Sequence, residues 1–514
     1  MSRSQGLSNS GVSSEKAAQA TCAAFSEETP ELGHLRYGMI NSSIIDGWIL
    51  MDKEKNTVGT NENASTAAFT SFLRRSPGLL INRNFGLLWC GQVISITGDF
   101  VFDTTLVLWI TTVIARNQSW SPLAVSGLLM MTTIPTFVVG PLAGVFVDRW
   151  DKRQTMMRMD VARAILITLL LSFTGLFSLP WLTRGYFTAF WQIGATYTVV
   201  FLATCCAQFF NPSRLALIGD LVDEPERARA TGLLQMTTSI AVVIAPSLAA
   251  LLFFSAGIQW ALIIDALSFL ISFVAILMVQ APPAARSSVS GEEHHFWREF
   301  AEGIRFSMGN QVLTTILLAL VLVILGSGAL TTLNVFFVTQ NLHAPASFYG
   351  VLSSALGAGA VIGAILAGLL AQQIGAARMF WLALLVFGVI VLIYARMTSF
   401  IPAAVLLFFL GLPNSSLNVA AIPLLLHVTP RELIGRVSAV ITPIQSLTVT
   451  ISAALAGYLD GVALRGFHAS FLGITFGPID TIFTGTALLA LSGGFYAMAK
   501  LRGIKLAARN PTSK

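Results

Sequence analysis

The chain has 514 residues, of which 54% are hydrophobic and only 11% are charged, and its mean hydropathy is +0.73. This balance excludes an ordinary soluble globular protein and indicates an all-α polytopic membrane protein. The net charge of +6 does not indicate a nucleic-acid partner, because the basic residues follow a membrane pattern.

The N-terminal extension, residues 1–76, is rich in Ser, Ala, Thr, Asn and Glu and has no sustained apolar period. We predict that it is disordered and cytoplasmic. The stretch 39–51 is too short and too polar to be the core of a secretory signal. Translation that begins at Met39 or Met51 is an open alternative.

Beyond this extension, apolar runs of about 20 residues, the length that crosses a bilayer, alternate with short polar breaks. They predict twelve membrane-spanning helices, at 85–114, 123–147, 157–179, 187–210, 231–255, 259–279, 312–338, 348–374, 379–395, 401–426, 437–459 and 479–499. On this path all but four of the 31 Lys and Arg residues fall on one side of the membrane, and the exceptions are Arg116, Arg184, Arg396 and Arg465. The positive-inside rule therefore predicts that both termini are cytoplasmic.

An internal repeat supports a division into two six-helix bundles, predicted at 77–280 and 312–505. The segment 142–153 aligns with 366–377, and 222–251 aligns with 428–457. Two parallel repeats of six helices, related about an axis along the membrane normal, are the expected result.

Two carboxylates, Asp99 and Asp103, lie in the middle of the first predicted helix and share one face because they are four residues apart. Acids inside membrane spans are costly, and two close acids in a low dielectric oppose each other's ionisation. We expect this pair to face a central cavity, where it exchanges a coupling proton or holds a cationic substrate. The alternative is a structural hydrogen bond to a neighbouring helix.

The stretch GPLAGVFVDRWDKR at 140–153 follows an apolar run with an abrupt charge cluster, which marks a turn at a membrane face. It resembles the signature between the second and third helices of major facilitator superfamily transporters, carried here by Gly144, Asp148, Arg149, Lys152 and Arg153. Asp151 stands where that signature has glycine. An ordinary positively charged loop is the alternative.

The resemblance covers about residues 81–505 and is best for the exporter branch that includes macrolide and enterobactin efflux proteins. The segments at 82–99 and 435–440 also read like that branch. In the family this turn is thought to lock one conformation and release another. Asp160 and Arg163, three residues apart, are expected to pair and to brace it.

The fifth helix resembles the antiporter signature of the same superfamily, with its proline kept and every glycine replaced by alanine. The matching positions are Ala241, Ala245, Pro246, Ala249 and Ala250. Close helix packing is expected to survive, because alanine is the next smallest side chain. The departure weakens the implication of antiport, and a uniporter or lysolipid flippase fits this helix equally well.

The remaining polar positions are candidates for a cavity lining. In the sixth helix Asp265 resembles an element of the same branch, and a structural hydrogen bond with Ser268 or with a neighbouring helix is favoured over a transport role. The uncharged candidates are Gln92, Gln208, Gln235, Asn334, Asn414 and Asn418. Gly411 and Pro413 are expected to break the tenth helix beside Asn414 and Asn418 and to free backbone carbonyls.

Between the bundles, residues 281–311 are predicted to form a cytoplasmic linker that ends in an amphipathic surface helix. His294 and His295 adjoin it and are more typical of a solvated pair than of a metal site. The residues 506–514 are predicted to be a cytoplasmic tail. The cysteines, of which Cys205 and Cys206 are neighbours, have no metal-ligand spacing.

We therefore expect a monomeric plasma-membrane exporter of small lipophilic molecules, such as drugs, macrolides or siderophores, coupled to protons and working by alternating access. No cofactor and no nucleic-acid partner are expected. A non-transporting receptor and a membrane-embedded enzyme are less favoured. For an enzyme, the chain lacks an H-E-x-x-H motif and a nucleotide-binding glycine loop.

Overall fold

The computed structural model describes residues 81–147, 149–174, 189–280, 296–430, 433–467, 469–471 and 474–502. The chain divides into two units, Met1–Gly78 and Leu79–Lys514, and all of these residues lie in the second. The predicted extension and tail fall outside the described residues, as do Asp148, Arg184, His294 and His295.

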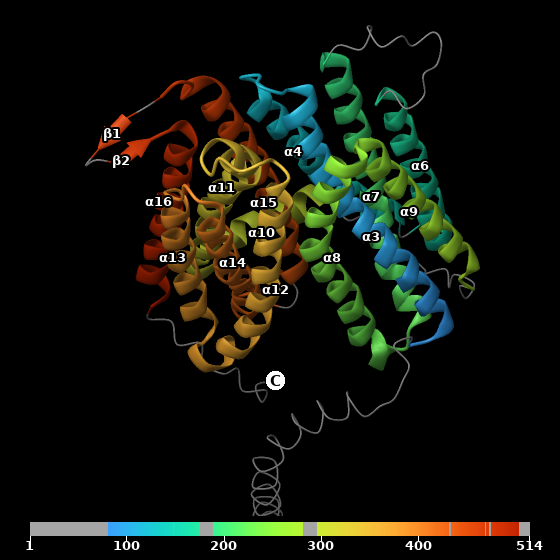
Figure 1. Ribbon diagram of the computed structural model, residues 1–514. Coiled ribbons are helices and arrows are strands. Elements are labelled where there is room, and N and C mark those ends of the chain that lie inside the picture. Colours follow the sequence, from blue (N-terminus) through green and yellow to red (C-terminus); the bar gives the residue numbers. More distant parts are fainter. Residues whose placement is uncertain are drawn as a thin grey trace, which may run out of the picture. The chain divides into compact units, whose positions relative to one another are not determined.

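The first half of the second unit is a set of long helices (Figure 1). Its elements are α3 (Arg83–Trp109), the π-helical turn η1 (Ile110–Ile114), α4 (Ser121–Val138), α5 (Gly140–Val147), α6 (Lys152–Phe173), α7 (Ala189–Leu221), the 3₁₀ turn η2 (Glu224–Glu226), α8 (Arg227–Ala256) and α9 (Ile258–Met278). The predicted second helix is divided into α4 and α5 at Val139, four residues after Pro135.

The second half begins with α10 (Phe296–Gly309), a helix on the segment between the two bundles. It continues with α11 (Gln311–Gln340), α12 (Phe348–Ile374), α13 (Ala376–Tyr394), α14 (Phe400–Val428), α15 (Ile434–Tyr458), the π-helical turn η4 (Leu459–Ala463) and α16 (Pro478–Leu501). Strands β1 (Ala469–Phe471) and β2 (Ile474–Phe476) form an antiparallel pair before α16.

Eleven helices of the described residues are long and apolar enough to cross a membrane. The remaining long helix of the first half, α6, carries Lys152, Arg153 and Arg158 in its first two turns. It nevertheless packs along α7 and α9, as a membrane-embedded neighbour would. The prediction of an all-α fold with twelve membrane-spanning helices is confirmed.

Several helices begin or end at residues other than the predicted ones, because polar residues cap a helix or lie within it. Asp151 caps α6 by accepting a hydrogen bond from the Gln154 backbone at 2.7 Å, so this helix begins five residues earlier than its apolar run. The fourth helix, predicted at 187–210, continues to Leu221 and places Arg214 inside it.

The two halves contact each other mainly through two helix pairs, α4 with α15 and α8 with α12, and α4 also contacts α11 and η4. The hydroxyls of Thr133 and Thr450 lie 2.5 Å apart in the first pair, and those of Ser247 and Ser354 lie 2.8 Å apart in the second. Direct contacts between the halves are therefore made partly by neutral hydroxyl pairs.

The tenth predicted helix is not broken at Gly411 and Pro413. It continues through both residues as α14, so the predicted break is wrong. Pro413 nevertheless has no N–H, so the carbonyl of Phe409 is left without its helical hydrogen bond. Gly411 instead packs against the backbone of α12, and a Cβ atom on Gly359 of α12 would overlap the carbonyl oxygen of Phe408. These glycines let two helices approach closely, which is their usual use inside membranes.

Gly359→Ala is expected to lower the melting temperature of the protein in detergent micelles, because its methyl group meets the backbone of α14. Gly368→Ala on the same helix is the matched control, since a Cβ there has nothing within 4 Å. The control should be neutral or stabilising by up to about 1 kcal/mol, since alanine favours helix. Equal melting temperatures for the two variants would contradict this account of the packing.

Candidate functional site

Asp99 and Asp103 lie on α3, the helix that packs between α8 and α9. Asp99 is half-buried and Asp103 is exposed, although Val101 and Phe102 beside it are buried. Asp103 lies within electrostatic range of Asp99 and also of Tyr349, which belongs to α12 in the other half. This helix face therefore points toward the space between the halves.

Asp160 and Arg163 of α6 form a buried ion pair in the same half. The two side chains are 0% and 5% exposed and are joined at 2.7 Å, so the pairing expected from their spacing is present. The Arg163 guanidinium also stacks over the rings of Phe210 and Phe269, each centroid at 4.4 Å. Its positive charge also acts on Asp99.

Arg214 of α7 is a second cation here, and it was not among the predicted site residues because it lies beyond the predicted end of its helix. Its Nη1 donates to Gln92 at 2.9 Å, and Gln92 in turn donates to Ser272 at 3.2 Å. Arg214 also attracts Asp99 electrostatically. Gln92, predicted as a cavity residue, thus links α3, α7 and α9 in the interior.

Asp265 of α9 is only 1% exposed, and neither carboxyl oxygen has a hydrogen-bond partner among the described residues. The expected side-chain bond with Ser268 is replaced by a bond of 2.7 Å from the Ser268 hydroxyl to the Asp265 main-chain oxygen. Gly98 of α3 makes room for this carboxylate, because a Cβ there would lie 2.8 Å from Asp265 Oδ1.

We call Asp99, Asp103, Asp160, Asp265, Arg163 and Arg214 the acidic cluster. Its four carboxylates and two guanidiniums come from four helices of one half. With more acids than bases in a low dielectric, the cluster is a place where carboxylates can bind and release protons.

The charged turn after α5 is fixed to its neighbours by its basic residues. Lys152 binds Asp220 at the end of α7 at 2.8 Å, and Arg153 donates to the main-chain oxygens of Ile276 and Leu277 at 3.0 and 2.6 Å. Arg149 is exposed in the turn, and Gly144 lies within α5. These bonds tie the turn to α7 and to the end of α9.

The small residues of the fifth span, α8, are buried and contact both the other helices of the first half and α12 of the second half. Ala245 and Ala249 pack with Val101 and Ala261 in the first half. Toward the other half, a Cβ on Gly350 of α12 would overlap the Pro246 carbonyl and lie 2.7 Å from Ala250 Cβ. The alanine-substituted signature, which also contains the buried Ala241, thus retains close packing.

The other polar candidates lie apart from the acidic cluster. Gln208 donates to Thr136 at 3.1 Å, and Asn334 is buried and accepts from the Tyr394 hydroxyl at 2.5 Å. Asn418 donates to the main-chain oxygen of Asn414, and Gln235 is exposed. The interactions of Gln208 and Asn334 join helices within one half, as structural side chains do.

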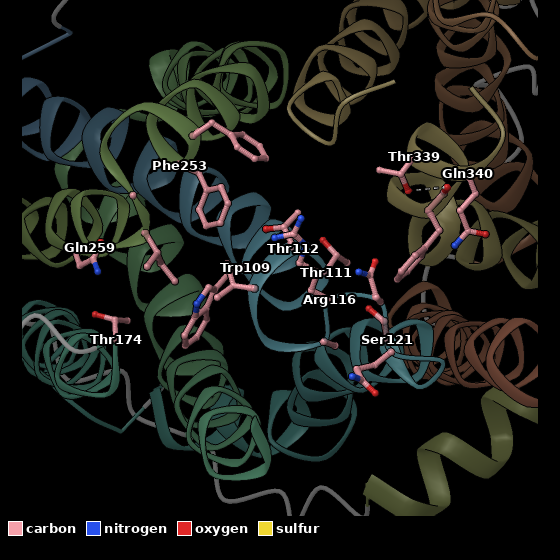
Figure 2. A pocket seen from close by; sticks show the side chains of 18 residues that line it. Trp109, Thr111, Thr112, Arg116, Ser121, Thr174, Phe253, Gln259, Thr339 and Gln340 are labelled. Atoms are coloured by element: carbon pink, nitrogen blue, oxygen red, sulfur yellow. Dashed lines mark hydrogen bonds between the residues drawn. The ribbon is translucent and has the colours of Figure 1, made fainter. Parts of the chain in front are cut away.

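A cavity of about 890 Å³ lies at the start of α4, whereas the charged turn follows α5 at the other end of the same span. Figure 2 shows the side chains that line the cavity. It is lined by the ends of α3, α8 and α11, by η1 and by the starts of α4 and α9. None of the residues nominated from the sequence lines it. Its own lining combines aromatic rings, amides and hydroxyls with Arg116.

Comparison with known proteins gives the family. Residues 77–509 match the family model described as transmembrane secretion effector. The chain is 26% identical over 392 residues to the uncharacterized MFS-type transporter YkuC of Bacillus subtilis, which covers 73% of this chain and 86% of YkuC. It is 25% identical over 234 residues to macrolide efflux protein A of Streptococcus pyogenes, covering 46% of this chain and 53% of that protein.

Among solved structures, a bacterial homologue of the iron transporter ferroportin in its inward-facing state superposes with a TM-score of 0.64 at 14% identity. The match covers 82% of this chain and 99% of the homologue, and at this identity it shows the fold alone. The twelve spans and the match over residues 77–509 lead to one conclusion: the chain belongs to the transmembrane secretion effector family of the major facilitator superfamily and is a multi-pass membrane transporter, not an enzyme.

Proposed function

We propose that this transporter exports small lipophilic molecules across the plasma membrane in exchange for protons, by alternating access of a site between its two halves. The observation that carries the proposal is Asp103, an exposed carboxylate in mid-helix that shares a helix face with Asp99 and lies within electrostatic range of Tyr349 of the other half. A carboxylate at the space between the halves is suited to exchange a proton when that space opens.

The similarity to macrolide efflux protein A supports export of lipophilic compounds, although the match covers about half of that relative. In this proposal the charged turn at Lys152 and Arg153 stabilises one conformation through its bonds to α7 and α9. The excess of basic residues on the side of the charged turn supports cytoplasmic termini.

If the termini are cytoplasmic, impermeant maleimide should label Gln118→Cys, and not Trp150→Cys, from outside a cell.

The test is accumulation of radiolabelled erythromycin in cells with and without the gene. Expressing cells should hold less label at steady state, and an uncoupler should raise it to the level of cells without the gene. An Asp99→Asn, Asp103→Asn double variant, expressed at the same level, is the matched negative control. If no compound in a panel of drugs and siderophores changes its accumulation with expression, the proposed export is wrong.

A second candidate is a uniporter or lysolipid flippase of the same fold. The observation that favours it is the fifth helix, where alanine replaces every glycine of the antiporter signature. Purified protein in liposomes separates the two, since a uniporter equilibrates its substrate without moving protons, whereas an antiporter acidifies or alkalinises the lumen as substrate moves.

A further inference from the structure

The cavity at the Arg116 end of the helices is separate from the acidic cluster and differs from it in charge. Arg116 is the one charged residue among its lining residues. No ion pair to this guanidinium is found within the part of the chain that the structure describes. The local charge at this end is therefore positive, whereas the cluster in mid-membrane holds four carboxylates.

The floor of the cavity is aromatic and its rim is polar. Trp109, Phe253 and Phe336 are buried and supply flat apolar surface. Gln118, Gln259 and Gln340 add amides at the rim, and Figure 2 shows Arg116 between Trp109 and Phe253 on one side and Thr339 and Gln340 on the other. A cavity of about 890 Å³ with these walls has the volume and the character of a small-molecule site.

Three further features lie at this cavity: a buried hydroxyl without a partner, a π-helical turn and a left-handed residue. Ser121 is 4% exposed and lines the cavity, and its hydroxyl has no hydrogen-bond partner among the described residues. The helix that carries Trp109 ends in the π-helical turn η1, a rare element that is frequent at functional sites. Asn117, next to Arg116, has a left-handed φ of 58°.

We propose that this cavity binds organic anions that join an aromatic body to a carboxylate or a similar anionic group. The body stacks on Trp109 and Phe253, the anionic group pairs with Arg116, and the Ser121 hydroxyl is a free donor within the lining. Asp460 of η4, which packs on the same end of α4, lies outside the lining. The site goes beyond the proposed export, because nothing in the proton exchange at Asp103 requires it.

The test uses three probes with one body, namely 9-anthracenecarboxylate, 9-anthracenemethanol and 9-anthracenemethylammonium. Energy transfer from tryptophan to anthracene reports binding to purified protein in phosphatidylcholine nanodiscs. The carboxylate should bind saturably and at least about tenfold more tightly than the other two, the effect of one charge-assisted hydrogen bond. Trp109→Leu, which removes the one tryptophan of the lining, should weaken binding of all three probes, because it removes the ring on which the body stacks.

Arg116→Gln should weaken carboxylate binding about tenfold, and Arg116→Glu should reverse the preference so that the ammonium probe binds best. Arg465→Gln, at another exposed arginine outside the lining, is the matched control and should change nothing. Nanodiscs that also contain phosphatidylglycerol distinguish the source of the anion, since a lipid headgroup that fills the site would weaken the carboxylate probe by competition.

Equal affinity for the three probes would overturn the proposal, and so would an anion preference that persists in Arg116→Glu. The measurement reports equilibrium binding, so its result does not depend on whether erythromycin export is observed. If export fails while anion binding is intact, the proposed function is wrong and the anion site remains supported.

Discussion

Replacing Asp103 with asparagine is expected to reduce substrate accumulation driven by a pH gradient at least about tenfold in inside-out vesicles. Asparagine keeps the shape and polarity of the side chain and has no proton to exchange, so the imposed gradient no longer drives the substrate. Exchange of labelled for unlabelled substrate, with no gradient, should persist, because alternating access itself is intact. Asp99→Asn should have a smaller effect, because this carboxylate lies in the field of Arg163 and Arg214.

The matched control is Asp223→Asn, an exposed aspartate in the turn before α8. It should transport like the parent. If Asp103→Asn, Asp99→Asn and the double variant all keep full gradient-driven accumulation, the acidic cluster does not carry the coupling proton. Loss of both exchange and gradient-driven transport would instead assign Asp103 to substrate binding.

Removing the charge of Arg163 is expected to cost about 3 to 5 kcal/mol of stability, the usual effect of breaking a buried ion pair. Arg163→Met leaves Asp160 buried without its counter-charge and also removes the stacking on Phe210 and Phe269. Unfolding of the purified protein in mixed micelles, followed by circular dichroism, measures the loss.

Two further variants show how much of this loss of stability comes from the buried, unpaired carboxylate. Lys152→Met breaks an ion pair whose side chains are 28% and 43% exposed, and it should cost less than about 1 kcal/mol. The double variant Asp160→Asn, Arg163→Met should recover part of the stability, since it removes the uncompensated carboxylate. If Arg163→Met costs as little as Lys152→Met, the buried pair is not a source of stability.

The membrane-spanning helices were predictable because each spans the bilayer with about 20 apolar residues, a bulk property that local detail does not disturb. Their ends were less predictable. Asp151 begins α6 ahead of its apolar run by capping it, and α7 continues for eleven residues beyond its predicted end through Asn211 and Arg214. Gly411 was predicted to break a helix, whereas its effect is to let α12 and α14 pack closely.

The candidate site was predictable only where its residues share a helix. The four-residue spacing of Asp99 and Asp103 and the three-residue spacing of Asp160 and Arg163 place each pair on one face. Arg214 joins them from a distant helix, and no local pattern in the sequence indicates this. The cavity at Arg116 is assembled from the ends of helices far apart in the chain, so its one local signal was a lone arginine at a turn between spans.

The hydroxyl pairs between the halves have a consequence for how the contact between the halves responds to salt. Thr133 with Thr450 and Ser247 with Ser354 are neutral contacts, each worth about 1 kcal/mol. Their strength hardly depends on ionic strength, unlike that of exposed ion pairs. The contribution of these pairs to the contact between the halves is therefore nearly the same in dilute and in concentrated salt.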